Sequence, residues 1–250
     1  NISGTNSYAG AITLSTNTVR IHSDTGTAFT LSGGITNGGI ALNIGGVGNI
    51  TMSTVAIAGT GTLTKDGSGT LTFNFANTYT GLTTITAGSL TYGTNDAIST
   101  GAVTVNGSTA ILAFGAYTDT VGAVTLTAGS ITGTGSSSQG ILTSTSGFTL
   151  NPATGKTVTV SAILAGAVNL TKSDLGTANL SGVNTYSGTT TINASGGTLA
   201  ITGAGQLNSG SYSGTIAIGS GSTFAYSSTA NQTLSGVISG AGTFTKDTGS

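Results

Sequence analysis

The sequence predicts an all-β fold, a parallel β-helix (β-solenoid) of roughly twelve coils with almost no helix. Three observations lead to this fold class: short segments of alternating polar and apolar residues, a near absence of charged helix formers, and a phrase that occurs twice in the same register. The chain has 250 residues, of which 36% are apolar, 43 are Gly and only 4% are charged, whereas about 25% of residues are charged in typical globular domains.

The alternating segments are short and spread over the whole chain. An alternation with a period of two residues is typical of a strand with one buried face. Gly residues between the segments can turn the chain. Examples are Thr62-Leu63-Thr64, Thr70-Leu71-Thr72-Phe73, Ala102-Val103-Thr104-Val105, Ala123-Val124-Thr125-Leu126-Thr127 and Thr157-Val158-Thr159-Val160.

The composition disfavours both helix and disorder. Six Asp and no Glu stand beside four Lys, one Arg and one His, and the abundant Thr, Val and Gly are poor helix formers. Disordered chains are rich in charge and poor in apolar and β-branched residues, and this chain has the opposite composition. We therefore expect the chain to fold, and to fold as strands.

A repeated phrase identifies the structural unit. It reads KDGSGTLTFNFANTYTG at 65–81 and KSDLGTANLSGVNTYSG at 172–188, and Lys and Tyr are 14 positions apart in both copies. Shorter echoes occur at 3–14, which matches 181–192, and at 240–250, which matches 59–69. We expect the phrase to mark the same coil corner in every copy, with these structural anchors: Lys65, Asn77, Tyr79, Gly81, Lys172, Asn184, Tyr186, Gly188, Asn6, Tyr8 and Lys246.

The spacing of the anchors favours a solenoid over a sandwich. The Tyr anchors are 71 and 107 residues apart and the Lys anchors 107 and 74, and the differences of 36 and 33 suggest modules that grow by whole turns. A solenoid tolerates added coils because each coil contacts only its neighbours. With roughly 20 residues per coil and strands about 4.8 Å apart, residues 1–250 would form one continuous rod about 60 Å long, with repeat modules near 1–15, 59–92, 166–201 and 234–250.

The two ends nearly continue one another. In the repeat alignment Asn1 corresponds to Thr72, and Ser250 corresponds to Gly69. This predicts either a segment of a longer repetitive chain or copies that stack end to end, and in both cases uncapped ends that associate with further coils. The low charge favours such contact, because little like-charge repulsion opposes it.

Charge and hydropathy limit the partners. The formal net charge of -1 leaves too little positive charge to neutralise a row of phosphates, so nucleic acid is not an expected partner. No apolar run approaches the roughly 18 residues of a membrane helix, so we expect no membrane insertion by this segment. The absence of Cys excludes disulfides and thiolate sites but leaves the compartment open.

Residues 61–90 and, less closely, 169–199 match the phrase G-x-L-T-K-x-G-x-G-T-L-x-L-x-G-x-N-T-Y-T-G-x-T-x-I-x-A-G-x-L. This phrase resembles the autotransporter-associated (passenger-associated) β-strand repeat of bacterial autotransporter passenger domains. The resemblance implies a right-handed parallel β-helix that is exported and displayed at the bacterial cell surface. The chain departs from the pattern at Phe75, where Gly or Ser is usual, and at Leu175 and Ala178.

No catalytic, metal or cofactor site is predicted. His22 and Asp24 are close, but His22 is the only His and no Gly-x-Ser-x-Gly elbow is present. A carbohydrate-active enzyme would need at least two Asp within about 10 Å in a cleft. The Asp residues occur singly at 24, 66, 96, 119, 174 and 247, and those at 66, 174 and 247 belong to the repeat turn, where we expect Asp to cap its own backbone.

We expect structural roles for the recurring Asn, Tyr and Thr residues, and for Tyr and Thr a binding role is the alternative. Asn6, Asn77 and Asn184 are expected to stack as a ladder along the rod. The three Tyr anchors are expected to pack their rings at the corner with the hydroxyl at the surface, with a glycan-stacking platform as the alternative. The Thr-x-Thr triplets could bind ice if they aligned on one face, but their unequal spacing argues against it: Thr62/Thr64, Thr70/Thr72, Thr125/Thr127, Thr157/Thr159 and Thr243/Thr245.

Together with the resemblance to autotransporter passenger domains, these observations predict a non-enzymatic structural β-solenoid of an exported bacterial surface protein or extracellular fibre, serving as a stalk, adhesin or filament segment. A module that binds a surface glycan or a host receptor is the alternative, and would show an aromatic or polar groove. An ice-binding solenoid and a carbohydrate-active β-helix enzyme are less favoured.

Overall fold

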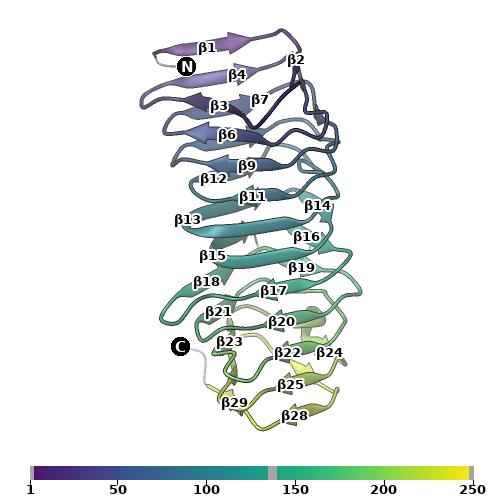
Figure 1. The fold of residues 1–250 in the computed structure, drawn as a ribbon. Coiled ribbons are helices and arrows are strands. Elements are labelled where there is room, and N and C mark those ends of the chain that lie inside the picture. The colour runs from purple at the N-terminus through teal and green to yellow at the C-terminus, as the bar shows by residue number, and fades with distance from the viewer. Residues whose placement is uncertain (1–2, 135–139, 248–250) are drawn as a thin grey trace.

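The computed structural model describes residues 3–134 and 140–247, which form a parallel β-solenoid of about 11 turns. Figure 1 shows the coils stacked one on another from the N-terminal to the C-terminal end. Helix is confined, within these residues, to a single turn, η1 (Asn208–Gly210), and no helix among them could cross a membrane. The predicted all-β solenoid is confirmed, with about 11 turns in place of twelve.

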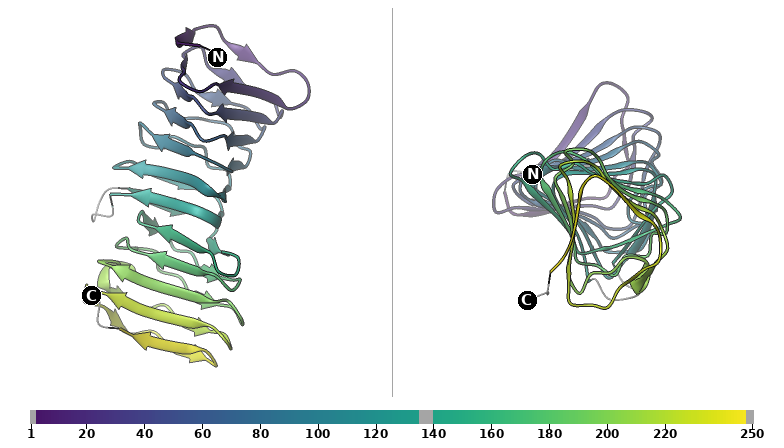
Figure 2. Two further views of the ribbon diagram at one scale, coloured as in Figure 1. Left: turned by 90° about the vertical axis from the view of Figure 1, so that its left-hand side faces the viewer. Right: turned by 90° about the horizontal axis from the view of Figure 1, so that it is seen from below.

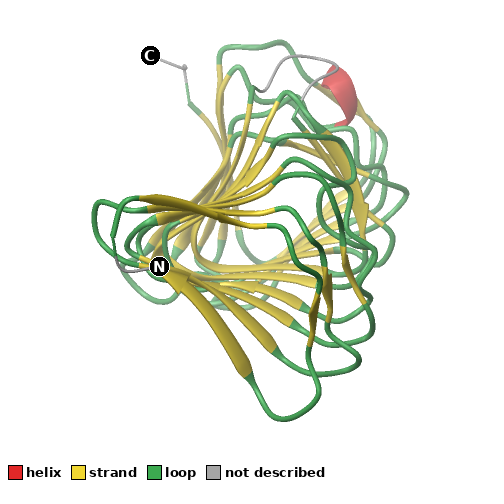
Figure 3. Cartoon of the chain, turned by 90° about the horizontal axis from the view of Figure 1, so that it is seen from above, coloured by secondary structure: helices red, strands yellow, loops and turns green. Residues whose placement is uncertain are grey.

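Each coil has two long faces and a short third side, and loops join them at the corners (Figures 2 and 3). The first face contains β3 (Val19–Ser23), β6 (Leu42–Gly46), β9 (Leu63–Asp66), β11 (Thr83–Ile85), the starts of β13 (Val103–Gly115) and β15 (Val124–Gly133), β17 (Phe148–Leu150), β20 (Leu170–Lys172), β22 (Thr190–Ile192), β25 (Ile216–Ile218) and β28 (Ile238–Gly240).

The second face contains the ends of β13 and β15 and ten further strands. These are β1 (Thr5–Tyr8), β4 (Ala28–Leu31), β7 (Asn49–Met52), β10 (Thr70–Phe73), β12 (Ser89–Tyr92), β18 (Thr157–Val160), β21 (Thr177–Leu180), β23 (Thr198–Gly203), β26 (Thr223–Ser228) and β29 (Thr243–Lys246). The third side contains β2 (Ile12–Thr13), β5 (Ile35–Thr36), β8 (Ile57–Ala58), β14 (Thr118–Val121), β16 (Ile141–Ser144), β19 (Ile163–Ala165), β24 (Ser211–Tyr212) and β27 (Thr233–Leu234).

The length of a coil varies along the rod. Leu63 pairs with Thr83, 20 residues later, whereas Thr190 pairs with Ile216, 26 residues later. The corner loops absorb these differences, because strand pairing fixes only the faces. Differences of 33 and 36 residues therefore do not correspond to whole turns, and that part of the spacing argument is wrong.

The alternation predicted from the sequence fills the interior of the rod. On the second face Leu71 pairs with Leu90, and Leu90 pairs with Leu112, and all three side chains are fully buried. Burying one such side chain contributes about 1.5–3 kcal/mol. The core is therefore a continuous column of stacked apolar side chains that each coil extends.

Two anchor glycines lie where neighbouring coils come closest. A Cβ atom on Gly81 would stand 2.2 Å from the carbonyl oxygen of Gly61, and one on Gly188 would stand 2.3 Å from that of Val168. No side chain fits at such distances. These positions need Gly because the backbone of the preceding coil occupies the space.

Candidate functional site

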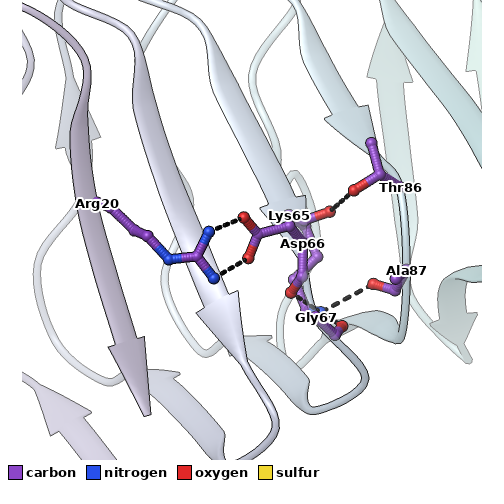
Figure 4. A network of polar contacts seen from close by, with 6 residues as sticks. All are labelled: Arg20, Lys65, Asp66, Gly67, Thr86 and Ala87. Carbon is purple, nitrogen blue, oxygen red and sulfur yellow. Dashed lines mark hydrogen bonds and ion pairs between the residues drawn. The ribbon is translucent and has the colours of Figure 1, made fainter.

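The anchor Lys65 is buried in the core of the rod. It lies in β9, where its partners in the two adjacent coils are Ile44 and Ile85, and the residue is fully inaccessible to solvent. Its Nζ donates three hydrogen bonds to backbone carbonyl oxygens: to Asp66 at 2.8 Å, to Gly67 at 2.8 Å and to Ala87 at 2.9 Å (Figure 4). The first two acceptors belong to its own turn and the third belongs to the next coil.

Lys172 repeats this arrangement in β20. Its Nζ donates to the carbonyl oxygens of Ser173 and Asp174, both at 2.7 Å, and to that of Gly196 in the next coil, at 2.6 Å. Burial lowers the pKa of Lys65 and of Lys172 to about 8. Both amines therefore stay protonated at neutral pH, with all three N–H groups paired.

The corner asparagines join three successive coils. The Oδ1 of Asn77 accepts a hydrogen bond from the N–H of Ile57 in the preceding coil, at 2.7 Å, and its Nδ2 donates to the carbonyl of Ala97 in the following coil, at 2.5 Å. Asn184 likewise accepts from the N–H of Leu164 and donates to the carbonyl of Gln206. The predicted ladder of stacked Asn side chains is wrong, because each amide bonds to neighbouring backbone and not to another Asn.

The internal tyrosines are fully buried, including their hydroxyl groups. Tyr79 Oη lies 2.6 Å from Thr83 Oγ1, and Tyr186 Oη lies 2.8 Å from Thr190 Oγ1, which also contacts Tyr212 Oη at 2.8 Å. Burial raises the pKa of Tyr79 and of Tyr186 well above the ordinary value. The expected surface hydroxyl, and with it a glycan-stacking platform on these two rings, is therefore wrong.

The outer copies of the phrase do not adopt the arrangement of the inner ones. Tyr8 is 47% exposed and lies in β1 on the second face, and Asn6 in the same strand donates to the carbonyl of Ser3. Lys246 lies in β29, also on the second face, opposite Tyr226. The inner anchors need carbonyl and N–H groups from adjacent coils, and the described coil at each end has such a neighbour on one side only.

The repeat-turn Asp66 forms an ion pair between coils. Its carboxylate oxygens accept hydrogen bonds from both terminal nitrogens of Arg20 in β3, one of them at 3.0 Å (Figure 4). We find this contact where we expected a backbone cap. His22 Nε2 and Asp24 Oδ1 are 3.7 Å apart, and both side chains are about half exposed.

Two Asp residues that are isolated from other acidic residues in the sequence, Asp96 and Asp119, line the same hollow on the third side. This hollow is open and has a volume of about 340 Å³. The separation of Asp96 and Asp119 by 23 positions corresponds to one coil, a signal that can be used only once the coil length is known. No group of three or more His, Asp, Glu or Cys side chains that could hold a metal occurs among the described residues.

The Asp119 carboxyl resembles the corner asparagines in its contacts. Its Oδ2 accepts hydrogen bonds from the N–H of Ile98 in the preceding coil, at 3.0 Å, and from the hydroxyl of Tyr92, at 2.8 Å. Burial, with a smaller contribution from the charge of Asp96, raises the pKa of Asp119 to about 7. Because these bonds hold the corner together, we interpret the carboxyl as a structural group.

The Thr triplets singled out in the sequence divide between two faces. Thr64 of β9 and Thr125 of β15 lie on the first face, whereas Thr72 of β10, Thr159 of β18 and Thr243 of β29 lie on the second. The sequence argument against their alignment on one face is thus confirmed for these triplets.

Comparison with known proteins identifies the repeat. Residues 63–91 and 170–201 each match the passenger-associated transport repeat. The resemblance to autotransporter passenger domains is confirmed: the chain carries two such repeats in a β-solenoid. Neither the curated proteins nor the solved structures gave a match.

Proposed function

We propose that the chain is a non-catalytic stalk segment of an exported bacterial surface protein, a stiff spacer whose end coils associate with further coils, either of a flanking β-helix or of a second copy. The observation that carries this proposal is the set of polar contacts that each inner repeat makes with adjacent coils. The presence of passenger-associated transport repeats supports export to the cell surface.

The inner repeats resist separation of the coils. Lys65 bonds to the next coil, Asn77 bonds to the coils on both sides, and Tyr79 bonds to Thr83 within the same core. A neutral buried hydrogen bond contributes about 0.5–1.5 kcal/mol and one to a charged group about 1.5–3 kcal/mol. Such contacts stiffen a rod that contains no Cys for disulfides.

Apolar side chains at both ends of the described solenoid support association with a further coil, of a flanking β-helix or of a second copy. Val237 is 67% exposed, Ile238 38% and Phe244 43% in the last coil, and Tyr8 is 47% exposed in the first. An open parallel edge offers unpaired backbone groups to another strand. A second copy would cover these side chains by the same coil-on-coil contact that the rod uses internally.

Electron microscopy of the purified chain tests this proposal, with particle length measured against concentration. We expect rods that lengthen in whole multiples of one unit as concentration rises, and Val237→Lys with Phe244→Lys should keep them single. Leu175→Lys is the matched control, because Leu175 is 55% exposed away from both ends. Rods of constant length at all concentrations would contradict end-to-end association.

The non-catalytic part of the proposal has its own test. Incubation with bacterial and host polysaccharides should release no product. Cleavage that is lost in Asp96→Asn or Asp119→Asn would instead assign the hollow on the third side to a carbohydrate-active enzyme.

A further inference from the structure

The first face carries seven threonines in one unbroken file. Strand pairing places each directly beside the next: Thr64, Thr84, Thr104, Thr125, Thr149, Thr171 and Thr191. Each lies between two inward-facing residues and therefore points outward, and all seven are half-buried. With adjacent strands about 4.8 Å apart, the file is about 29 Å long.

The hydroxyl groups of this file are available to a ligand. None of the seven has a side-chain hydrogen bond with any part of the described chain, whereas the inward-facing Thr83 and Thr190 bond to tyrosines. The only charged side chain that projects outward from the seven strand segments is Asp66 in the first of them, and it is paired with Arg20. The file is thus a regular, nearly uncharged row of hydroxyl and methyl groups.

We propose that this threonine file binds ice, as a surface that holds water molecules in lattice positions. Each hydroxyl can donate one hydrogen bond and accept others, and the adjacent methyl group excludes disordered water. The β-branched side chain restricts χ1, and the ladder fixes the spacing, so little entropy is lost on binding. Charged groups would instead orient water around themselves.

A second copy of the chain is a weaker candidate for this face. A strip about 29 Å long and three residues, or about 10 Å, wide covers about 290 Å². A stable protein interface buries about 800 Å² on each partner. Ice offers an extended flat lattice, so a narrow regular row can bind to it along its whole length.

Ice recrystallisation and thermal hysteresis, measured with the purified 250-residue chain, test the proposal. The wild-type chain should inhibit ice growth, and the double variant Thr125→Lys, Thr149→Lys in the middle of the file should need at least ten times the concentration for the same inhibition. Thr159→Lys, on an exposed position of the second face, is the matched control and should behave as wild type. Far-ultraviolet circular dichroism shows whether each variant is folded.

The proposal would be overturned if the folded wild-type chain left ice growth unchanged. It would also be overturned if Thr159→Lys lost as much inhibition as the double variant. If the Lys variant does not fold, Thr125→Ala with Thr149→Ala replaces it, and undiminished inhibition by that pair would equally exclude the file. A dimer in sedimentation that dissociates in the double variant would assign the face to a second copy.

Discussion

Replacing Asp119 by Asn should remove a pH-dependent loss in the free energy of unfolding of the solenoid. Asp119 holds its corner as Asn77 and Asn184 hold theirs, by accepting an N–H bond from the preceding coil. The single carbonyl oxygen of Asn can accept the bonds that Ile98 and Tyr92 now donate to one carboxylate oxygen. The substitution therefore preserves these contacts and removes the charge.

The magnitude follows from the pKa of the carboxyl group. Burial, reinforced by Asp96, raises the pKa of Asp119 from 3.8 to about 7. A folded state with the higher pKa binds the proton more tightly than the unfolded chain. The contribution of Asp119 to the free energy of unfolding is therefore greatest below about pH 4, falls between about pH 4 and 7, and is level above that. A difference of about three units at 1.36 kcal/mol per unit gives a loss of about 4 kcal/mol at pH 8.

Urea unfolding of both proteins at pH 4 to 8 measures this effect. Asp119→Asn should be more stable than wild type by up to about 4 kcal/mol at pH 8, and the two free energies of unfolding should converge near pH 4. Asp96→Asn, at an exposed position of the same hollow, should change the profile much less. Parallel profiles for wild type and Asp119→Asn would refute the reasoning, because they would mean that the carboxyl has no raised pKa in the fold.

Three further substitutions test the contacts of the inner repeats by thermal and urea unfolding. Lys65→Met leaves three half-buried carbonyls without this donor, at up to about 1–3 kcal/mol each, so it should destabilise far more than Lys156→Met at an exposed position; equal effects would contradict the buried amine. Tyr186→Phe should cost only about 1 kcal/mol, because the Tyr212 hydroxyl still reaches the same threonine; no loss would mean that the hydroxyl bond is not made. Gly81→Ala should cost about 3 kcal/mol or more, whereas Gly26→Asn, in open space at a φ of +72°, should be nearly neutral, and the reverse order would argue against the close coil contact.

The alternation of the strands and the repeated phrase were sufficient to predict the fold. Segments such as 70–73 reveal one buried face by their period of two, and parallel stacking follows from a unit that is reused at a distance. The sequence could not give the coil length, because corner loops of 20- and 26-residue coils differ while their strands look alike. Without that length, the meeting of Asp96 and Asp119 was not predictable.

The burial of Lys65 and Lys172 was not predicted, for a different reason. In Leu63-Thr64-Lys65 the alternation itself places Lys on the inward side with Leu63, yet charged residues are rarely fully buried unless paired, which favours a surface turn. The paired groups are backbone carbonyls, two from the turn and one from the next coil, and such acceptors leave no mark in the sequence. The place of Lys65 in the alternation, on the same side of the strand as Leu63, was the signal that could have predicted the buried lysines.

The inner repeats also explain how a chain of nearly interchangeable strands finds one register. The strands consist mainly of Thr, Val, Ile and Gly and resemble one another closely. A strand that slipped by one residue would therefore still find apolar and polar residues beside it in the next coil, although its inward-facing side chains would now face outward. Such a slip would turn Lys65 outward, so the carbonyls of Gly67 and Ala87 would lose their hydrogen-bond donor. It would also separate Tyr79 from Thr83. Each repeat thus penalises misregistration by several unpaired buried or half-buried groups, at up to about 1–3 kcal/mol each. Lys65 and Lys172 are five coils apart on the first face, in β9 and β20, so a slip that begins between them meets a fixed register in both directions.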